Sequence, residues 1–536
     1  MSTDSAPSRL PDLRERTLNH AFARALDRRP DALAHIGRDG QWTYAQAYDR
    51  SLRLAAGVDR AGVAPGDRVA ALLDNSFDAM HVYLGLGLTG RVQVPINTAY
   101  KGTFLSHVIN DCGSAVVVVE GRYCGRLAAI ADEIPQVSTV VVRGESDEAL
   151  PAGRFRVIPF GELLTGPVAA PLDAQPWDVQ AYFYTSGTSG VSKGVRVPQA
   201  QAYTYASRED DPRAGDHERI LVVLPIFHLA GQMFGIYQSL ISAATCVLEP
   251  AFSVGTFWEL VREHRITTTL LLGGMAQMVE LRPESERDQE HPLELVHMAP
   301  LVADVAAFRA RFGVEVGSVY GSTEAGCPVV GPPETIVGGE CGYPRPGYRC
   351  RVVDEHDIEV ATGEIGELVV RSDEPWTMFD GYVGLPEATE KAYRNLWFHT
   401  GDAFRADETG RLFFVDRVKD ALRRRGENIS SFEVERVIND HPSVLESAVV
   451  AVPAEYAEDE IKAVVVVREG ADFDPADLMR FLIPRMPYFM VPKFVEVVPE
   501  MPRTPTQKVR KNVLRDSGIA GAWDREGAGI VVTRNS

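Results

Sequence analysis

The chain has 536 residues, of which 45% are hydrophobic and 24% are charged. This mixture is typical of globular proteins, and the length allows several domains, so long-range disorder and a fibrous repeat are excluded. The 55 Lys and Arg residues are outnumbered by 74 Asp and Glu, which gives a net charge of −19. A broad nucleic-acid or anionic-membrane surface is therefore excluded, and an anionic ligand has to be met by local cations and backbone N–H groups.

The termini and the cysteines indicate a cytoplasmic, reduced protein. The N-terminal residues are polar and show no signal-peptide pattern, and no apolar run reaches the roughly 18–20 residues of a membrane helix. No two of the six cysteines form a Cys-x-x-Cys pair, and none has a His at zinc-ligand spacing. We expect no membrane insertion, no nucleic-acid partner and no zinc site.

The pattern along the chain predicts an α/β fold. From about residue 42, amphipathic helical stretches alternate with short apolar runs, which is typical of parallel sheets flanked by helices. The runs expected to form strands are 68–73, 115–119, 220–224, 268–272 and 315–319. After about residue 340, short strands separated by Gly, Asp and Glu turns predict a small antiparallel β layer, and a compact α+β unit follows beyond residue 420.

The strongest local motif is the loop Tyr184-Thr-Ser-Gly-Thr-Ser-Gly-Val-Ser-Lys-Gly194, which follows an apolar run at 179–184. Its glycines let successive N–H groups point at one anion, while its hydroxyls and Lys193 add donors, so the loop is suited to phosphate. It is not a Walker A loop, because Lys193 precedes Gly194 rather than Ser or Thr.

The loop has two other interpretations. It could be a plain Gly/Ser surface loop. It also contains the G-x-S-x-G pattern of a nucleophile elbow at 190–194, but an elbow needs a strand directly before Ser192 and a helix directly after it. Residues 195–198 read as extended, so the hydrolase interpretation is disfavoured.

Further motifs follow in order along the chain. They are Leu224-Pro-Ile-Phe-His228, Val319-Tyr-Gly-Ser-Thr-Glu324, Trp397-Phe-His-Thr-Gly-Asp402, Asp416-Arg-Val-Lys-Asp420 with Arg425-Gly-Glu-Asn-Ile-Ser430, and Pro502-Arg-Thr-Pro-Thr-Gln-Lys508. With the glycine-rich loop, they resemble the signatures of the adenylate-forming (AMP-binding) superfamily over residues 40–512. The stretches 375–402 and 423–435 look most like carnitine/crotonobetaine-type CoA ligases.

The resemblance implies an AMP-forming ligase that uses ATP, Mg²⁺ and CoA. The carboxylate of a small-molecule acid reacts with ATP to give an acyl-adenylate and pyrophosphate, and a thiol then attacks the adenylate. Two anions meet in the first step, so the site needs cations and donors where charge develops on the α-phosphorus.

The resemblance also implies a role for each matching residue. Lys508, Thr323 and His228 are the expected catalytic residues, and Glu324 is the expected Mg²⁺ ligand. Nucleotide and CoA contacts are expected from Thr185, Ser186, Gly187, Thr188, Ser189, Gly190, Lys193, Tyr320, Gly321, Asp402, Arg417 and Gly426. The acid pocket is expected to be lined by Phe227, His228, His297, Met298 and Ser322.

The same resemblance supplies the domain organisation. We expect an N-terminal adenylation domain over residues 1–416, a hinge at 417–420 centred on Lys419, and a mobile α+β domain over 421–536. In one pose the small domain delivers Lys508 for adenylation, and in the other it brings the Gly426 segment to the site for thioester formation.

The sequence departs from the family pattern at His297-Met-Ala-Pro-Leu301, where most members have small residues. Side chains of this size predict a small or medium acid, aromatic or inorganic acids included, rather than a long fatty acid. An amine acceptor, with acids that include nitrite, is the alternative to CoA, and a carrier protein is another. A non-catalytic nucleotide-binding protein is disfavoured, because binding alone does not need Lys508. The oligomeric state is not encoded in these motifs.

Overall fold

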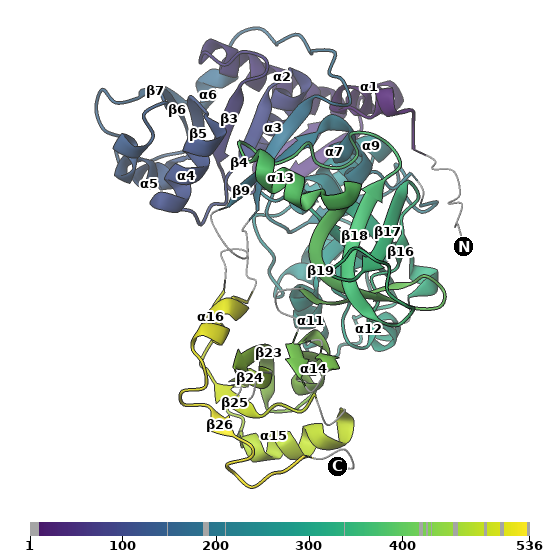
Figure 1. The fold of residues 1–536 in the computed structure, drawn as a ribbon. Helices are drawn as coiled ribbons and strands as arrows, with labels where there is room; N and C mark the ends of the chain where they lie inside the picture. The colour runs from purple at the N-terminus through teal and green to yellow at the C-terminus, as the bar shows by residue number, and fades with distance from the viewer. Residues whose placement is uncertain are drawn as a thin grey trace. The chain divides into compact units, whose positions relative to one another are not determined.

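The computed structural model shows two compact units, one made of Met1–Arg349 with Val370–Phe398 and the other of Cys350–Val369 with His399–Ser536 (Figure 1). The structure describes residues 10–146, 148–185, 192–209, 211–336, 338–417, 422–424, 427–429, 431–453, 459–486, 490–503 and 509–532. The hinge expected at 417–420 stays a prediction.

The first unit contains a seven-stranded sheet in the order β7-β6-β5-β3-β4-β8-β9. All neighbours are parallel except β8 and β9, which pair antiparallel. Its strands are β3 (Arg68–Leu72), β4 (Val92–Pro95), β5 (Val116–Glu120), β6 (Thr139–Arg143), β7 (Arg156–Pro159), β8 (Val179–Thr185) and β9 (Lys193–Pro198). The helices around this part of the chain are α1 (Leu18–Arg28), α2 (Tyr44–Arg60), α3 (Phe77–Leu88), α4 (Thr103–Cys112), α5 (Cys124–Ala129), α6 (Phe160–Leu163) and α7 (Gln199–Ala206).

A nine-stranded sheet lies in the same unit, in the order β16-β15-β14-β13-β12-β10-β11-β1-β2. Its centre, from β1 to β14, is parallel, and both edges are antiparallel. Its strands are β1 (Leu33–Gly37), β2 (Gly40–Thr43), β10 (Arg219–Val222), β11 (Thr245–Leu248), β12 (Thr268–Leu272), β13 (Leu295–Ala299), β14 (Glu315–Ser322), β15 (Gly326–Gly331) and β16 (Tyr343–Pro344). Its helices are α8 (Leu229–Gly231), α9 (Gln238–Ser242), α10 (Phe257–Glu263), α11 (Gly273–Glu280) and α12 (Val305–Phe312). The segment Gln232–Tyr237 between α8 and α9 is kinked, because its backbone is not helical at Phe234 and Gly235.

Local sequence signals explain many of these boundaries. Thr43 and Gln46 form a capping box that starts α2, and Asp304 accepts a hydrogen bond from the Ala307 N–H to start α12. Gly313 ends α12 in the left-handed conformation, at φ 66°, where a residue with a side chain would be strained. The all-valine run of β5 is buried on both faces, as expected for a central parallel strand.

A third sheet, in the order β17-β18-β19-β20, is followed by the C-terminal α+β part of the second unit. The strands of the third sheet are β17 (Tyr348–Val353), β18 (Ile365–Ser372), β19 (Phe398–Ala406) and β20 (Leu412–Arg417), and helix α13 (Pro386–Ala392) lies between β18 and β19 in the chain. The remaining elements are β21 (Leu422–Arg424), β22 (Glu427–Ile429), α14 (Ser431–Asn439), β23 (Val444–Pro453), β24 (Asp459–Val467), α15 (Pro475–Leu482), β25 (Phe494–Val497), α16 (Lys511–Asp516) and β26 (Trp523–Asp524).

The predicted fold class is confirmed: parallel sheets are flanked by helices, and the chain ends in an α+β part. The strand expected at 268–272 coincides with β12, and the strand expected at 68–73 is β3 with one residue less. Two features were not expected from the sequence. One is the β1–β2 hairpin, which forms one edge of the nine-stranded sheet, although the other strands of that sheet come much later in the chain. The other is helix α13.

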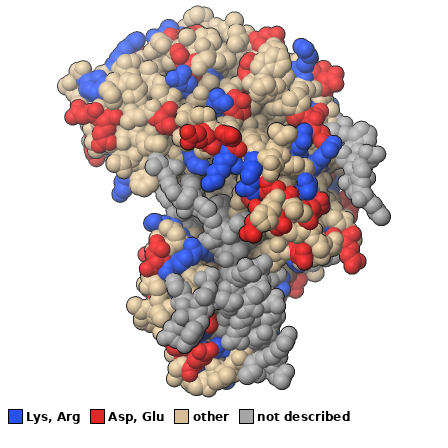
Figure 2. Space-filling model, viewed as in Figure 1, with Lys and Arg blue, Asp and Glu red and all other residues tan. Residues whose placement is uncertain are grey.

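On the face shown in Figure 2, Lys and Arg are interspersed with Asp and Glu. All six cysteines are free thiols. Within the described part of the chain, the helices are too short or too polar to cross a membrane.

A buried histidine pair lies in the core between β1 and α3. His35 Nδ1 lies 3.0 Å from His81 Nε2, and both side chains are almost completely buried. Burial lowers the pKa of His35 to about 3 and lowers the pKa of His81 well below its ordinary value. Both rings are therefore neutral in the folded state, while the unfolded chain takes up protons below pH ~6.5.

We expect the fold to lose stability in acid because of this pair. Because burial lowers the folded-state pKa values, the contribution of the pair to stability is fully present above pH ~6.5. It is lost as the pH falls towards the folded-state pKa. Each histidine lowers the free energy of unfolding by about 1.4 kcal/mol between pH 7.5 and 5.5. Urea unfolding of the His35→Gln variant should show a pH dependence that is smaller by about this amount.

The matched control is His20→Gln, which removes an exposed histidine. Its pH dependence should equal that of the parent chain. An unchanged pH dependence in His35→Gln would show that the buried pair does not make the fold acid-sensitive.

Candidate functional site

The glycine-rich loop connects the antiparallel strands β8 and β9. Thr185 ends β8, Lys193 begins β9, and the two residues are cross-strand partners. At the second end of the loop, His107 Nε2–H donates to the Ser192 carbonyl at 2.8 Å, and the Tyr100 and Ser192 hydroxyls lie 3.1 Å apart. Both ends of the loop are therefore fixed at the carboxyl end of β8.

A segment from distant sequence extends this sheet beyond β9. The Val383 N–H donates to the Gly194 carbonyl at 2.8 Å, and the Arg196 N–H donates to the Gly381 carbonyl at 3.0 Å. Tyr382 forms an antiparallel bridge with Val195. This pairing brings the Tyr382 ring to Lys193, whose Nζ lies 4.8 Å from the ring centroid.

The turn after β14 carries the expected metal ligand. A Cβ at Gly321 would lie 2.3 Å from the Gly326 carbonyl oxygen, so only glycine fits this close approach. Ser322 Oγ accepts from the Ala325 N–H at 3.0 Å and closes the turn. Two neighbouring elements then hold the Glu324 carbonyl: Gln201 Nε2 of α7 donates to it at 3.1 Å and the Phe379 N–H at 2.9 Å.

The Glu324 carboxylate is held from one side by Tyr382. The tyrosine hydroxyl donates to Glu324 Oε1 at 3.0 Å. Burial, followed by the charge of Glu324, raises the pKa of Tyr382, so the phenol keeps its proton. Tyr382 therefore contacts both Lys193 and Glu324, which the sequence motifs place 131 positions apart.

This donor set fits Mg²⁺ that arrives with phosphates. Mg²⁺ prefers hard oxygen ligands and is usually held by one or two carboxylates together with substrate phosphate oxygens. Glu324 offers a carboxylate of this kind. Within the described residues there is no group of three or more His, Cys, Asp and Glu side chains that could hold a metal by itself.

The segment before α8 is fixed by side-chain amides. Asn75 Nδ2 donates to the Leu224 carbonyl at 2.9 Å, and Gln232 Nε2 donates to the Ile226 carbonyl at 2.7 Å. Phe227 and His228 follow, with ring centroids 4.6 Å apart, and His228 stands directly before the first residue of α8.

His297 and Met298 do not lie together. They are neighbours in β13 and so point to opposite faces of the sheet. Met298 is completely buried in the core with Val305 and Phe308 of α12. His297 contacts Phe234 edge-on at 4.9 Å. The expectation that both side chains line one acid pocket stays a prediction, with Met298 on the face of β13 opposite to His297.

The His297 side chain is buried beside Phe234. Both its ring nitrogens are buried, and neither has a hydrogen-bond partner among the residues that the structure describes. Burial, and after it the charge of Arg208, lowers the pKa of His297 well below its ordinary value. The ring is therefore neutral, with one donor and one acceptor unused.

The expected ribose contacts lie in the second unit. Asp402 is buried on β19, and its N–H donates to Thr400 Oγ1 at 3.1 Å. Asp402 and Arg417 are cross-strand partners of β19 and β20. Tyr320 lies on β14, and Thr323 lies in the turn after it. The predicted residues that lie outside the described part of the chain are Ser186, Gly187, Thr188, Ser189, Gly190, Lys419, Gly426 and Lys508.

Two residues of the site were missed by sequence reasoning, Gln201 and Tyr382. Tyr382 follows Asp380-Gly381 just before Pro386, which by itself predicts only a turn. Its role depends on pairing with β9, almost 190 positions away in the chain.

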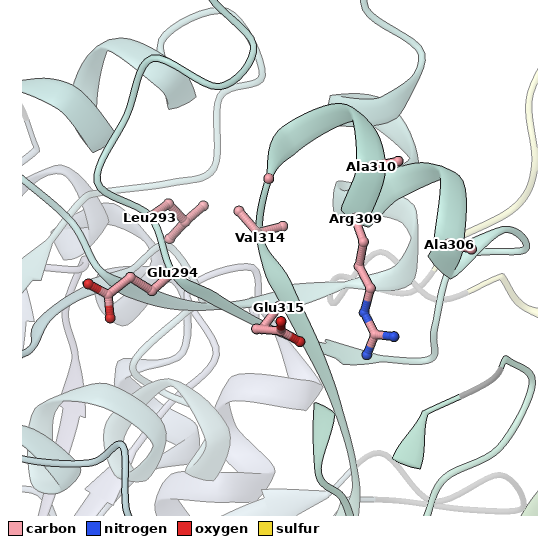
Figure 3. Close-up of a pocket in the computed structure, with 8 residues that line it drawn as sticks. Leu293, Glu294, Ala306, Arg309, Ala310, Val314 and Glu315 are labelled. Carbon is pink, nitrogen blue, oxygen red and sulfur yellow. The ribbon is translucent and has the colours of Figure 1, made fainter. Parts of the chain in front are cut away.

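A separate surface hollow of about 610 Å³ lies between α12 and the segments that lead into β13 and β14 (Figure 3). Figure 3 shows Arg309 projecting from α12 on one side and Glu294 on the other. This hollow lies at the amino ends of the parallel strands, whereas ligands of open α/β sheets bind at the carboxyl ends. It is not part of the site described above.

Two family models and several curated proteins match this chain. The AMP-binding enzyme family matches residues 22–383, and the AMP-binding enzyme C-terminal domain matches residues 433–508. The fatty acid–acyl-carrier-protein ligase ScoC of Streptomyces coeruleorubidus is 31% identical over 88% of this chain and 91% of its own. The crotonobetaine/carnitine–CoA ligase of Citrobacter koseri is 29% identical over 89% of this chain and 93% of its own.

Solved structures of ligases and synthetases are also similar to this chain. ATP-bound MatB from Rhodopseudomonas palustris has a TM-score of 0.82 and 30% identity, and the match covers 94% of this chain and 99% of MatB. The amide bond synthetase McbA from Marinactinospora thermotolerans has a TM-score of 0.79 and 26% identity, covering 93% and 99% of the two chains. With both its domains matched and the Lys193 and Glu324 motifs in place, the chain belongs to the AMP-binding enzyme family and is an AMP-forming ligase.

Proposed function

We propose that the enzyme activates a carboxylic acid as an acyl-adenylate, with release of pyrophosphate, and then transfers the acyl group to the thiol of CoA. The observation that carries the proposal is the contact of one side chain, Tyr382, with both Lys193 and Glu324. An ammonium at the start of β9 and a carboxylate in the turn after β14 match the two needs of a metal–triphosphate, which are a positive charge for phosphate and a hard oxygen for the metal.

The triphosphate is assigned to the β8–β9 connection. Thr185 and the loop residues 186–190 donate hydrogen bonds to the β- and γ-phosphates, and Lys193 supplies the charge. The support is the fixed edge at which Thr185 and Lys193 are paired, since donors that are already in place lose little entropy on binding.

The α-phosphate and the nucleoside are assigned to the β14 turn and to β19. Thr323 donates to the α-phosphate, Tyr320 offers a ring face to adenine, and Asp402 with Arg417 binds the ribose hydroxyls. Glu324 holds the metal, and Mg²⁺ bound there neutralises charge on the phosphate oxygens. The support is the rigid turn, whose backbone is held by Gln201 and Phe379.

The acid is assigned to the space beside Phe227, His228, Ser322 and His297. A neutral, buried His297 limits the length of the acid and offers it a polar contact, which favours small or aromatic acids over long fatty acids. Lys508 is assigned the contact between the carboxylate and the α-phosphate. Rotation about a hinge at Lys419 exchanges Lys508 for the Gly426 segment, which receives CoA.

An amine acceptor is the second candidate, supported by the similarity to the amide bond synthetase McbA. Pyrophosphate release should be measured with acetate, benzoate, cinnamate, nitrite and palmitate, each with CoA or an aryl amine, and the products identified by mass spectrometry. A CoA thioester supports the proposal. An amide, or a diazonium product from nitrite, supports the second candidate instead. Pyrophosphate release with none of these acids would contradict both.

Lys508→Ala should reduce pyrophosphate release by roughly 10²–10³-fold, the effect of losing one charged contact made only in the transition state. Thioester formation from supplied acyl-adenylate should stay within a few-fold of the parent. Stopped-flow measurement of the two half-reactions separates these effects.

The control is Lys391→Ala, which removes a positive charge at an exposed position of α13 and should change neither half-reaction. Equal loss in both half-reactions of Lys508→Ala would contradict the assigned role.

Glu324→Gln should raise the Mg²⁺ concentration needed for half-maximal rate, because an amide oxygen binds the metal more weakly than a carboxylate oxygen does. The test is a titration of Mg²⁺ against initial rate at saturating ATP. Glu315→Gln, in the hollow of Figure 3, is the control and should leave the metal dependence unchanged. The same metal dependence in Glu324→Gln and the parent would contradict metal binding by Glu324.

His297→Ala should shift the preference towards longer acids. Each newly buried CH₂ contributes about 0.8 kcal/mol, so space for two or three methylenes changes the ratio of kcat/KM for octanoate over acetate by roughly 10–50-fold. Met298→Leu changes the neighbouring residue on the opposite face of β13, with little change in volume, and should leave this ratio unchanged. A ratio that moves equally in both variants would contradict a specific role of His297 in the acid pocket.

A further inference from the structure

Tyr382 contacts two charged groups of opposite sign with different parts of one side chain. Its hydroxyl donates to Glu324 Oε1 at 3.0 Å, and its ring face lies 4.8 Å from Lys193 Nζ. The hydroxyl group makes a charge-assisted hydrogen bond, and the ring face makes a cation–π contact. They can therefore be removed separately.

The position of Tyr382 is set by its surroundings. Its N–H donates to Thr389 Oγ1 of α13 at 3.0 Å, and the flanking residues pair with β9. Gly381 has φ 89°, and a Cβ there would lie 3.0 Å from Thr389 Cγ2, so this approach to α13 needs glycine. Phe379, three residues earlier, packs against the Tyr382 ring at 5.0 Å. Tyr382 is thus held from α13, from β9 and from its own segment.

The two contacts matter because an ammonium and a carboxylate attract each other. A direct Lys193–Glu324 pair would satisfy both groups and compete with phosphate and metal. A hydroxyl that donates to Glu324 Oε1 and a ring face beside Lys193 Nζ keep each group in a defined place.

We propose that Tyr382 is a positioning residue for adenylation, whose hydroxyl orients the Glu324 carboxylate towards the metal and whose ring seats Lys193 for the triphosphate. This inference rests on the proposed function, in which Glu324 and Lys193 have these ligands. It adds a residue outside the predicted site and gives each part of its side chain a separate task.

The test compares Tyr382→Phe, which keeps the ring, with Tyr382→Leu, which removes the ring and the hydroxyl. Metal binding is followed by the loss of the free Mn²⁺ signal in electron paramagnetic resonance, with a non-hydrolysable ATP analogue present. Binding of the same analogue in EDTA, by calorimetry, reports on the triphosphate contact without metal. Neither measurement depends on turnover.

Tyr382→Phe should weaken Mn²⁺ binding by about tenfold, as expected for the loss of a hydrogen bond to a charged group, and should leave analogue binding in EDTA within twofold. Tyr382→Leu should weaken both, with analogue binding in EDTA reduced by roughly three- to tenfold. In steady state, Tyr382→Phe should change kcat and the metal requirement more than the KM for ATP.

The matched control is Tyr393→Phe. It removes a hydroxyl that donates to the Phe379 carbonyl at 3.2 Å, so it loosens the same segment without touching Lys193 or Glu324. Circular dichroism melting checks that each variant is folded. If Tyr393→Phe weakens Mn²⁺ binding as much as Tyr382→Phe, the segment acts only as a scaffold and the inference is wrong.

Failure of this inference is distinguishable from failure of the proposed function. If Glu324→Gln weakens Mn²⁺ binding and Lys193→Ala weakens analogue binding, while Tyr382→Phe and Tyr382→Leu change neither, the proposed function stands and the role of Tyr382 is wrong. If Glu324→Gln and Lys193→Ala themselves leave both kinds of binding unchanged, the proposed function fails, and the inference fails with it.

Discussion

The pairing of residues 380–383 with β9 is the contact on which the candidate site depends. Its backbone hydrogen bonds join two parts of the chain almost 190 positions apart and place Tyr382 beside Lys193. Just before it, the Phe379 N–H donates to the Glu324 carbonyl, so the same segment also contacts the turn after β14. One segment therefore connects β9 of one sheet to the turn after β14 of the other.

The two sheets contribute to the site by the same physical rule. In parallel sheets the side chains that follow the strands gather at the carboxyl ends, where the connections are free to vary. Thr185 ends β8 and Ser322 ends β14. Gly321 permits the close approach of the β14–β15 turn, and Gln201 of α7 holds that turn from the side. Groups fixed in this way before the substrate binds lose little entropy during the reaction.

The sequence predicted the features that depend on local pattern. Strands such as β3 and β12 follow from apolar runs between turns, and the phosphate loop follows from its glycines and hydroxyls. Tyr382 could not be found in this way, since its neighbours come from β9 and the β14 turn and no local signal encodes that pairing. The alternation of side chains along a strand is also a local rule, and it places His297 and Met298 on opposite faces of β13.

The proposed function depends on adenylation, that is, on attack of a carboxylate on the α-phosphorus with pyrophosphate as the leaving group. Isotope exchange between labelled pyrophosphate and ATP measures this step directly, without CoA or an amine. We predict exchange that requires the acid and a divalent metal and that proceeds without any acceptor. Formation of ADP and phosphate, with no label entering ATP in the presence of an acid that is turned over, would contradict it.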